Sequence, residues 1–514
     1  MNRLTKTYGS SIQGIDATVI TVEVNVTQGA KFYIVGLADN AVKESQQRIE
    51  SAIKNNGYSW PGFRIVVNLA PADIRKEGSA FDLPLAIGVL SASEQIKKDR
   101  LTDFVLMGEL SLDGSLQRAK GVLPIALSAR KDGFKGVILP SVNAMEAAVV
   151  KGLEVIAVDN LTEAIGFLND TLDLQPVAVK TMEQFYERST FFENDFSEVK
   201  GQENVKRALE IAAAGGHNLI MVGPPGAGKT MLAKRLPSIL PPLTLEEALE
   251  TTKIHSVAGK IGVENSLMTR RPFRNPHHTI SDIALTGGGN HPQPGEISLA
   301  HNGVLFLDEL PEFKRNVLEV MRQPLEDRVI TISRARYTVD YPASFMMIAS
   351  MNPCPCGYFN HPEKTCQCGP GNVKKYFNRI SGPLMDRIDI HIEIVPVPFR
   401  DLSHLREAEK SEVIRDRVIS ARKLQAERFK GNRSIYCNAQ MNSKLLRKYC
   451  RIDDASGKVL RIAMEKLGLS ARAYDRILKV SRTIADLESS PEIQSHHVSE
   501  AINYRNLDRE GWAG

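Results

Sequence analysis

The sequence predicts an α/β protein built from successive domains, and three observations along its 514 residues lead to that prediction. Short β-like runs alternate with amphipathic helices from residue 1 to about 170. Fully apolar runs, typical of buried parallel strands, recur around a glycine-rich turn between residues 196 and 400. Residues 401–514 are helical by pattern. We therefore expect an amino-terminal α/β domain (1–170), a linker (171–195), a core with a parallel sheet (196–400) and a helical domain (401–514).

The composition is that of a soluble globular protein, with 42% hydrophobic and 24% charged residues. No apolar run approaches the about 18 residues of a membrane span, and the amino terminus does not resemble a signal peptide. We expect a cytoplasmic protein without a membrane partner. The net charge of +5 permits a polyanionic partner without requiring one.

In the amino-terminal third, we expect strands at residues 17–24, 31–35 and 63–68. Two stretches, Lys76–Pro84 and the run from Gly108–Gly114 through Val137–Pro140, resemble the proteolytic domain of Lon. Lon-type proteases use a serine nucleophile and a lysine base.

Here the residues depart from that pattern. Ser79 lies near the expected nucleophile, but the dyad lysine falls on Leu123, which cannot accept a proton. Lys120 could replace it only if the local register shifted. The resemblance therefore implies a Lon-like fold without proteolysis.

The glycine-rich turn of the core matches the phosphate-binding pattern G-x-x-x-x-G-K-[S/T]. An apolar strand precedes it and a helix follows, which is the context the motif requires. Lys229 is expected on the β and γ phosphates of ATP, and the Thr230 hydroxyl on Mg²⁺. The nucleotide-binding residues are Gly223, Pro224, Pro225, Gly226, Ala227, Gly228, Lys229 and Thr230.

About eighty residues farther on, the apolar run Val304–Leu307 ends in two acids. We expect Asp308 to hold Mg²⁺ through water, and Glu309 to orient the attacking water and accept its proton. The alternative is a solvated turn.

The segment Phe196–Gln202 resembles the one that lies against adenine in AAA+ ATPases. These proteins keep a polar sensor after the next strand, and Asn352 follows the apolar run Phe345–Ser350. An amide both donates and accepts, which suits contact with a phosphate and a water. Asn352 could instead cap the turn before Pro353.

Two arginines complete the predicted ATPase site by resemblance. Ser381–Asp389 resembles the arginine-finger segment of magnesium-chelatase and replicative-helicase ATPases, which makes Arg387 the finger that one subunit supplies to its neighbour. Leu467–Arg476 resembles a lid-domain helix with a second sensor arginine. We assign Arg472 to the γ-phosphate, with Arg476 as its competitor.

A long glycine- and proline-rich insertion lies between the phosphate-binding loop and the apolar run that ends in Asp308 and Glu309. In helicase-like AAA+ proteins this place carries a loop that faces the central pore. We expect polar loop contacts rather than a metal from the nearby histidines, because no acidic or cysteine partner has matching spacing. These histidines are His277, His278, His291 and His301.

Two short strands, residues 328–333 and 336–341, predict a β-hairpin with a basic tip. In a ring, Arg334 and Arg336 are expected to contact DNA phosphates without reading bases. A solvated hairpin is the alternative.

Four cysteines give the spacing C-x-C-x₉-C-x-C on a loop. Four thiolates can complete a tetrahedral structural zinc site, and a closed set leaves no position for catalysis. Reduced free thiols or a redox pair are the alternatives. The residues are Cys354, Cys356, Cys366 and Cys368.

Taken in order, these motifs resemble the YifB/ComM family of magnesium-chelatase-like AAA+ ATPases. The resemblance implies a Lon-like domain, a P-loop core and a helical lid. It also implies a homo-hexamer that hydrolyses ATP to move single-stranded or branched DNA, as in branch migration during natural transformation. A metal-insertion motor, an ATP-dependent protease and a protein remodeller are the alternatives.

Overall fold

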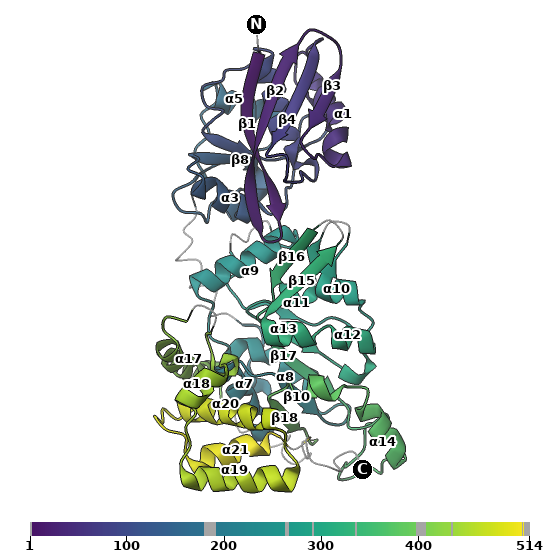
Figure 1. The fold of residues 1–514 in the computed structure, drawn as a ribbon, viewed down its shortest axis with the longest axis vertical. Helices are drawn as coiled ribbons and strands as arrows, with labels where there is room; N and C mark the ends of the chain where they lie inside the picture. The colour runs from purple at the N-terminus through teal and green to yellow at the C-terminus, as the bar shows by residue number, and fades with distance from the viewer. Residues whose placement is uncertain are drawn as a thin grey trace.

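The computed structural model describes residues 3–178, 192–262, 267–289, 292–334, 337–396, 408–432, 435–505 and 507. Three bodies follow one another along the chain (Figure 1). The amino-terminal domain stands at one end, the parallel-sheet core lies in the middle, and the carboxyl-terminal helices pack beside the core at the other end. The predicted α/β class is confirmed.

The amino-terminal domain is organised on a seven-stranded sheet in the order β3-β4-β2-β1-β5-β8-β9. The strands β1 and β2 form a long antiparallel hairpin, and β5, β8 and β9 are parallel. The bounds are β1 Arg3–Gln13, β2 Asp16–Thr27, β3 Phe32–Val35, β4 Arg64–Ala70, β5 Phe104–Leu106, β8 Gly136–Pro140 and β9 Glu154–Val158, with a small ribbon of β6 Glu109–Leu110 and β7 Leu116–Gln117. The helices are α1 Asn40–Asn55, α2 Asp82–Ala92, α3 Val122–Lys131, α4 Ser141–Ala147 and α5 Leu161–Leu168.

The three strands expected from the sequence are present. In β2 the buried side chains Ile20, Val22, Val24 and Val26 alternate with more exposed ones, as in a strand that packs one face on a core. The first strand, β1, was not predicted, because its residues are mostly polar. Thr5, Thr7, Ser10 and Ser11 are nevertheless buried there.

The core contains a five-stranded parallel sheet in the order β11-β14-β17-β10-β18. Every residue of β10, β14 and β17 is buried, which explains why these strands read as unbroken apolar runs. The strands are β10 Leu219–Val222, β11 Phe273–Arg274, β14 Val304–Leu307, β17 Met346–Met351 and β18 Ile390–Glu393, and the adjoining helices are α7 Glu203–Gly215, α8 Lys229–Arg235, α14 Pro370–Phe377 and α15 Gly382–Met385.

The insertions of the core lie between the core sheet and the amino-terminal domain (Figure 1). They include the predicted hairpin, whose strands pair in antiparallel register from Val329 with Pro342 to Arg334 with Tyr337. The elements are α9 Leu245–Val257, α10 Asp282–Thr286, α11 Glu296–Leu299, α12 Arg315–Glu319, α13 Arg322–Asp327, β15 Val329–Arg334 and β16 Tyr337–Pro342, with the small ribbon β12 Gly287–Gly288 and β13 Gln293–Pro294.

The carboxyl-terminal part is helical in its described residues: α17 Ser411–Arg428, α18 Ser443–Tyr449, α19 Asp454–Leu467, α20 Ala471–Leu487 and α21 Ser495–Asn503. The stretch 467–476, expected as one helix, is divided. The helix α19 ends at Leu467, Gly468 takes the left-handed conformation, and Ser470 caps α20 through its hydroxyl. Residues 401–407 of the expected helical domain lie outside the described residues.

Contacts between the amino-terminal domain and the core include one at a hairpin tip and one on α9. At the tip of the β1–β2 hairpin, Gly14 lies so close to Val339 of β16 that an added Cβ would come within 2.9 Å of Val339 Cγ1. At the second place, the buried Glu146 accepts a hydrogen bond from the Ser256 hydroxyl of α9. The hairpin of the core is therefore in direct contact with the amino-terminal domain.

Candidate nucleotide site

The predicted phosphate-binding loop connects β10 to α8, as its sequence context requires. Gly226 and Gly228 have φ angles of 79° and 87°, a left-handed conformation that other residues rarely adopt. These glycines allow successive backbone N–H groups to turn toward one point at the start of α8. The loop therefore has the shape of a phosphate cradle.

Lys229 lies inside this cradle. Its Nζ donates to the carbonyl oxygens of Gly223 at 2.6 Å and Pro224 at 2.9 Å, and to Asn352 Oδ1 at 3.1 Å. Burial lowers the pKa of Lys229, against the nearby charges of Asp308 and Glu309. The ammonium group of Lys229 thus donates to carbonyl and amide oxygens, and phosphate oxygens can replace these acceptors.

The contact with Lys229 places Asn352 beside the phosphate cradle. Asn352 comes directly after β17, at the carboxyl end of the sheet. This position suits the expected sensor better than a turn cap, since its side-chain oxygen faces the P-loop lysine.

Asp308 and Thr230 face each other across the site. Thr230 Oγ1 donates to Asp308 Oδ2 at 2.7 Å, and the Ser350 hydroxyl donates to Asp308 Oδ1. A hydroxyl and a carboxylate at this spacing are oxygen ligands of the type Mg²⁺ prefers, held directly or through water. The sequence interpretation missed Ser350, because it lies inside an apolar strand.

Glu309 extends from the end of β14 with a left-handed backbone, φ 55°, and its side chain is 58% exposed. His278 Nδ1 lies 3.4 Å from Glu309 Oε2. The carboxylate is thus open to solvent and held by one weak contact, as an acceptor of a water proton needs to be. Its histidine partner comes from the insertion.

Arg387 and Arg472 lie together, away from this cradle. They line one cavity of about 190 Å³, and none of the residues 223–230, all described, lines it. Arg387 is 8% exposed and pairs with Glu326 of α13 at 2.5 Å. Arg472 is 64% exposed and pairs with Asp386 at 3.2 Å.

The sheet fixes where this cavity lies. The strands β10 and β18 are parallel, with Leu219 opposite Ile390 and Val222 opposite Glu393. Asn218, just before β10, donates to the carbonyl of Arg387 at 3.0 Å. Arg387 is therefore at the amino end of the strands and the P-loop at the carboxyl end, about 10 Å farther along.

Arg476, the alternative to Arg472 as the second sensor, lies in a different environment. Arg476 donates to Asp389 Oδ1 at 2.8 Å, and Asp389 is 1% exposed. Asp389 also accepts from His217. Arg476 is thus held in a buried ion pair, whereas Arg472 remains open to a partner.

The four clustered cysteines converge as expected for a metal site. Their sulfur atoms lie within 4.8 Å of one another, and three Sγ pairs lie at 3.4, 3.6 and 3.7 Å. Zinc–sulfur bonds of about 2.3 Å in a tetrahedron place sulfurs about 3.8 Å apart. The residues therefore fit a zinc ion.

A second group, Glu488 with His496 and His497, has the ligand types of a metal site but a different explanation. His497 Nδ1 accepts from the backbone N–H of Gln494 at 2.9 Å, so in the neutral ring Nε2 carries the proton. Nε2 lies 3.0 Å from Glu488 Oε2 and donates to it. The group is satisfied as a hydrogen-bonded cap of α21.

The Lon-like residues do not form a dyad. The Ser79 hydroxyl donates to Glu109, and Leu123 is fully buried. The side chain of Lys120 lies over Gly259 of the core, where an added Cβ would meet Lys120 Cε at 3.2 Å.

The expected polar contacts of the insertion histidines are present in the described residues. His301 Nε2 lies 3.0 Å from Glu250, and His277 Nδ1 lies 2.9 Å from the Thr279 hydroxyl. His291 lies outside the described residues, as do Arg336 and the side chain of Arg334. The backbone places Arg334 at the end of β15, next to the turn.

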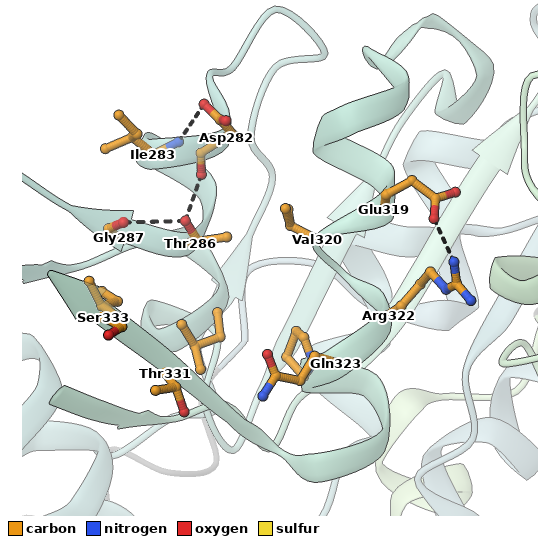
Figure 2. Close-up of a pocket in the computed structure, with 13 residues that line it drawn as sticks. Asp282, Ile283, Thr286, Gly287, Glu319, Val320, Arg322, Gln323, Thr331 and Ser333 are labelled. Atoms are coloured by element: carbon orange, nitrogen blue, oxygen red, sulfur yellow. Dashed lines mark hydrogen bonds and ion pairs between the residues drawn. The ribbon is translucent and has the colours of Figure 1, made fainter. Parts of the chain in front are cut away.

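A groove of about 700 Å³ runs along β15, one flank of the hairpin. Figure 2 shows Asp282, Ile283 and Thr286 of α10 on one side, Glu319 and Arg322 on the other, and side chains of β15 below. Ile283 is 52% exposed. The hairpin therefore has open space along one flank, toward the insertion.

Within the described residues, no helix combines the length and apolar character needed to cross a bilayer.

Three family models of the magnesium-chelatase subunit ChlI together cover most of the chain. "Subunit ChlI of Mg-chelatase" matches residues 22–143, "Magnesium chelatase, subunit ChlI" matches 195–402, and "Magnesium chelatase, subunit ChlI C-terminal" matches 408–505. These matches identify a nucleotide-hydrolysing core of the AAA+ type.

Individual proteins are also similar. The chain is 43% identical to the competence protein ComM of Haemophilus influenzae over 509 residues, which cover 98% of this chain and 97% of ComM. It is 43% identical to YifB of Escherichia coli over 501 residues, 96% of each chain. Lon protease 2 of Bacillus subtilis is 31% identical over 157 residues, 28% of this chain and 27% of that protein, in agreement with the predicted Lon-like fold. Because the identity with ComM and YifB spans nearly the whole of each protein, the chain belongs to the YifB/ComM family of magnesium-chelatase-like AAA+ ATPases.

Proposed function

We propose that this ATPase works as a ring, a homo-hexamer, in which each nucleotide site is shared by two copies and hydrolysis moves DNA through the centre. One observation carries the proposal: Arg387 and Arg472 line a common cavity at the opposite edge of the sheet from their own P-loop.

An arginine side chain extends about 7 Å from its Cα, which is less than the length of the strands that separate Arg387 from Gly223. Arg387 therefore does not reach the nucleotide of its own chain, and Arg472 lines the same cavity. Placed against the P-loop face of a second copy, Arg387 and Arg472 supply the positive charge that phosphoryl transfer needs as charge develops on the γ-phosphate.

The remaining residues act from within one chain. Lys229 exchanges its carbonyl contacts for phosphate oxygens when ATP enters, and Asn352 remains within reach of the same phosphate. Glu309 orients the water and accepts its proton. Thr230 and Asp308 would hold Mg²⁺, which would supply positive charge against the phosphates.

The DNA-moving part of the proposal rests on the β15–β16 hairpin. Arg334 ends β15 and Arg336 follows two residues later in the sequence. The hairpin adjoins an open groove, and Tyr341 of β16 donates to the carbonyl of Pro292 in the insertion, which reaches Glu309 through His278. Movement of the hairpin can thus be coupled to the state of the γ-phosphate. The similarity to the competence protein ComM supports a role in natural transformation, with branched or single-stranded DNA as the substrate.

A mixing experiment tests the shared site. We expect Lys229→Ala chains and Arg387→Ala chains to be inactive alone, because every interface lacks one half of the site. Mixed together they should regain turnover, since about one interface in four then joins an intact P-loop to an intact arginine. A mixture of Lys229→Ala with the double variant Lys229→Ala/Arg387→Ala is the control and should stay inactive. No recovery in the first mixture would contradict the shared site.

A second experiment tests the substrate. Forked or four-way DNA should stimulate ATP turnover, and casein should not be degraded. The variant Arg334→Ala/Arg336→Ala should lose the stimulation, and its DNA affinity should depend less steeply on salt, by about one in the slope per arginine. Arg451→Ala/Arg461→Ala, which removes two exposed arginines of the helical domain, is the matched control. Equal stimulation in both double variants would remove the hairpin assignment.

We also propose that the four clustered cysteines hold a structural zinc ion, since their sulfur spacing fits a closed tetrahedral set.

A further inference from the structure

The cysteine loop lies directly on the phosphate-binding loop. Gly357, in the turn that carries Cys354 and Cys356, has φ 83°, and a Cβ added to it would come within 2.5 Å of Pro225 Cδ. Only a residue without a side chain allows so close an approach. The backbone of the cysteine loop thus packs against the second proline of the P-loop.

The same segment touches the P-loop a second time. Asn352, two residues before Cys354, accepts from Lys229 Nζ at 3.1 Å. The stretch from Asn352 to Gly357 is therefore attached at one end to the P-loop lysine and at the other end to Pro225. Cys354 and Cys356 lie between these two contacts.

The loop that follows Asn352 has no regular secondary structure. From the end of β17 at Met351 to the start of α14 at Pro370, the described residues form turns and bends without helix or strand. The cysteines tie the two ends of the loop together, supported by N–H···S bonds from Phe359 to Cys354 at 3.3 Å and from Cys368 to Cys366 at 3.4 Å. The binding free energy of a metal is then what fixes an otherwise irregular segment.

We propose that the zinc-bound loop is a clamp on the nucleotide site: the metal in the cysteine cluster sets the position of Asn352 and Pro225, so that ATP binding and hydrolysis depend on metal occupancy. The inference rests on the zinc site proposed above. It adds a positioning role for a cluster whose closed ligand set takes no part in the chemistry.

Two variants of the full-length protein separate the metal from the contact. Cys366→Ser/Cys368→Ser removes ligands on the side of the cluster away from Asn352 and should abolish zinc, measured by elemental analysis of the purified chain. Gly357→Ala leaves all four ligands and should keep about one zinc per chain, but its Cβ pushes against Pro225. Both should weaken binding of a fluorescent, non-hydrolysable ATP analogue by about 10-fold to 100-fold, with a parallel loss of turnover.

The controls lie in the same chain. An added Cβ at Gly369 meets nothing within 4 Å, so Gly369→Ala should keep native zinc content and analogue affinity. Cys437→Ala removes a buried cysteine elsewhere and should also keep both. Circular dichroism melting of each variant identifies those that fold.

The outcomes are distinguishable. A native chain purified without chelator that holds no zinc overturns the metal site. Zinc present in the native chain, lost from the cysteine variant, and followed by unchanged analogue affinity overturns the clamp but leaves the metal. A folded Gly357→Ala chain with native zinc and native affinity also overturns the clamp. Loss of affinity in both variants, with Gly369→Ala unchanged, supports it.

Discussion

Arg476 and Asp389 form a buried ion pair where the carboxyl-terminal helices meet the core: Nη1 lies 2.8 Å from Oδ1, and Asp389 is 1% exposed. Although burial raises the pKa of Asp389, the charge of Arg476 and a hydrogen bond with His217 hold that pKa well below its usual range. Arg472 lies about one turn away on the same helix, exposed beside Arg387. Arg476 and Arg472 thus differ in burial and in partner, so substitutions can separate their effects.

We expect Arg476→Ala to destabilise the protein and Arg472→Ala to impair turnover. Removing Arg476 leaves the buried Asp389 without its arginine partner, a loss of about 3–5 kcal/mol that should lower the melting temperature. Removing Arg472 breaks one exposed ion pair, which is worth about 0–1 kcal/mol, so melting should hardly change. The kcat of Arg472→Ala should fall by about 100-fold, because Arg472 is proposed to stabilise the transition state. Calorimetry and steady-state kinetics check both, and equal melting losses in the two variants would contradict the distinction.

A second prediction concerns the exposed acid of the site. Glu309→Gln should bind ATP with native affinity and lose about 10²–10⁴ in turnover, because an amide can orient water but cannot take its proton. Asp308→Asn should instead raise the Mg²⁺ concentration needed for half-maximal turnover, because it removes a negative charge that faces Thr230. Magnesium titrations of the two variants separate these effects. Identical magnesium curves would argue against the separate roles.

The nucleotide site was predictable where local motifs encode it. The P-loop, Asp308, Glu309 and Asn352 each follow a strand whose apolar run is visible in the sequence, and parallel strands bring their carboxyl ends to one edge. The position of Arg387 was not predictable in this way. Arg387 precedes β18, and its place at the amino end of the strands depends on how β18 pairs with β10.

Contacts between distant segments were also hidden. Gly357 against Pro225, and Gly14 against Val339, are tertiary approaches made possible by glycine, and a glycine in a loop reads only as a turn. The strand β1 was missed because buried threonines and serines do not give the apolar alternation that identifies a strand.

The contact of the first domain with α9 gives a prediction about pH. Burial raises the pKa of Glu146, despite hydrogen bonds from Ser256 and Leu123. A carboxyl group whose pKa is raised by folding favours the folded state below its unfolded pKa of about 4.3, and this stabilisation is lost as pH rises toward the folded value. Glu146→Gln keeps the acceptor oxygen but cannot ionise. Its melting temperature relative to the native chain should therefore rise between about pH 4 and pH 8.

Glu154→Gln is the control for this experiment, because Glu154 is a partly exposed carboxylate of β9. Its melting difference from the native chain should change much less across the same range. A Glu146→Gln chain that is less stable than the native chain at high pH would show that the ionised carboxylate is the favoured form.

We expect the β1–β2 hairpin tip of the amino-terminal domain to influence the stimulation of ATP turnover by DNA. Ile15, next to Gly14 at the tip, packs with Val339 against the apolar cluster of the core that includes Ile330 and Ile332. Ile15→Asp places a charge in this contact and should detach the tip from the β15–β16 hairpin. Because Ile15 and Val339 do not lie at the P-loop, basal ATP turnover should persist. Stimulation of turnover by branched DNA should fall severalfold. The exposed neighbour Gln13→Asp adds the same charge outside the contact and should leave stimulation intact. Native stimulation in a folded Ile15→Asp chain would mean that the first domain touches the hairpin without influencing it.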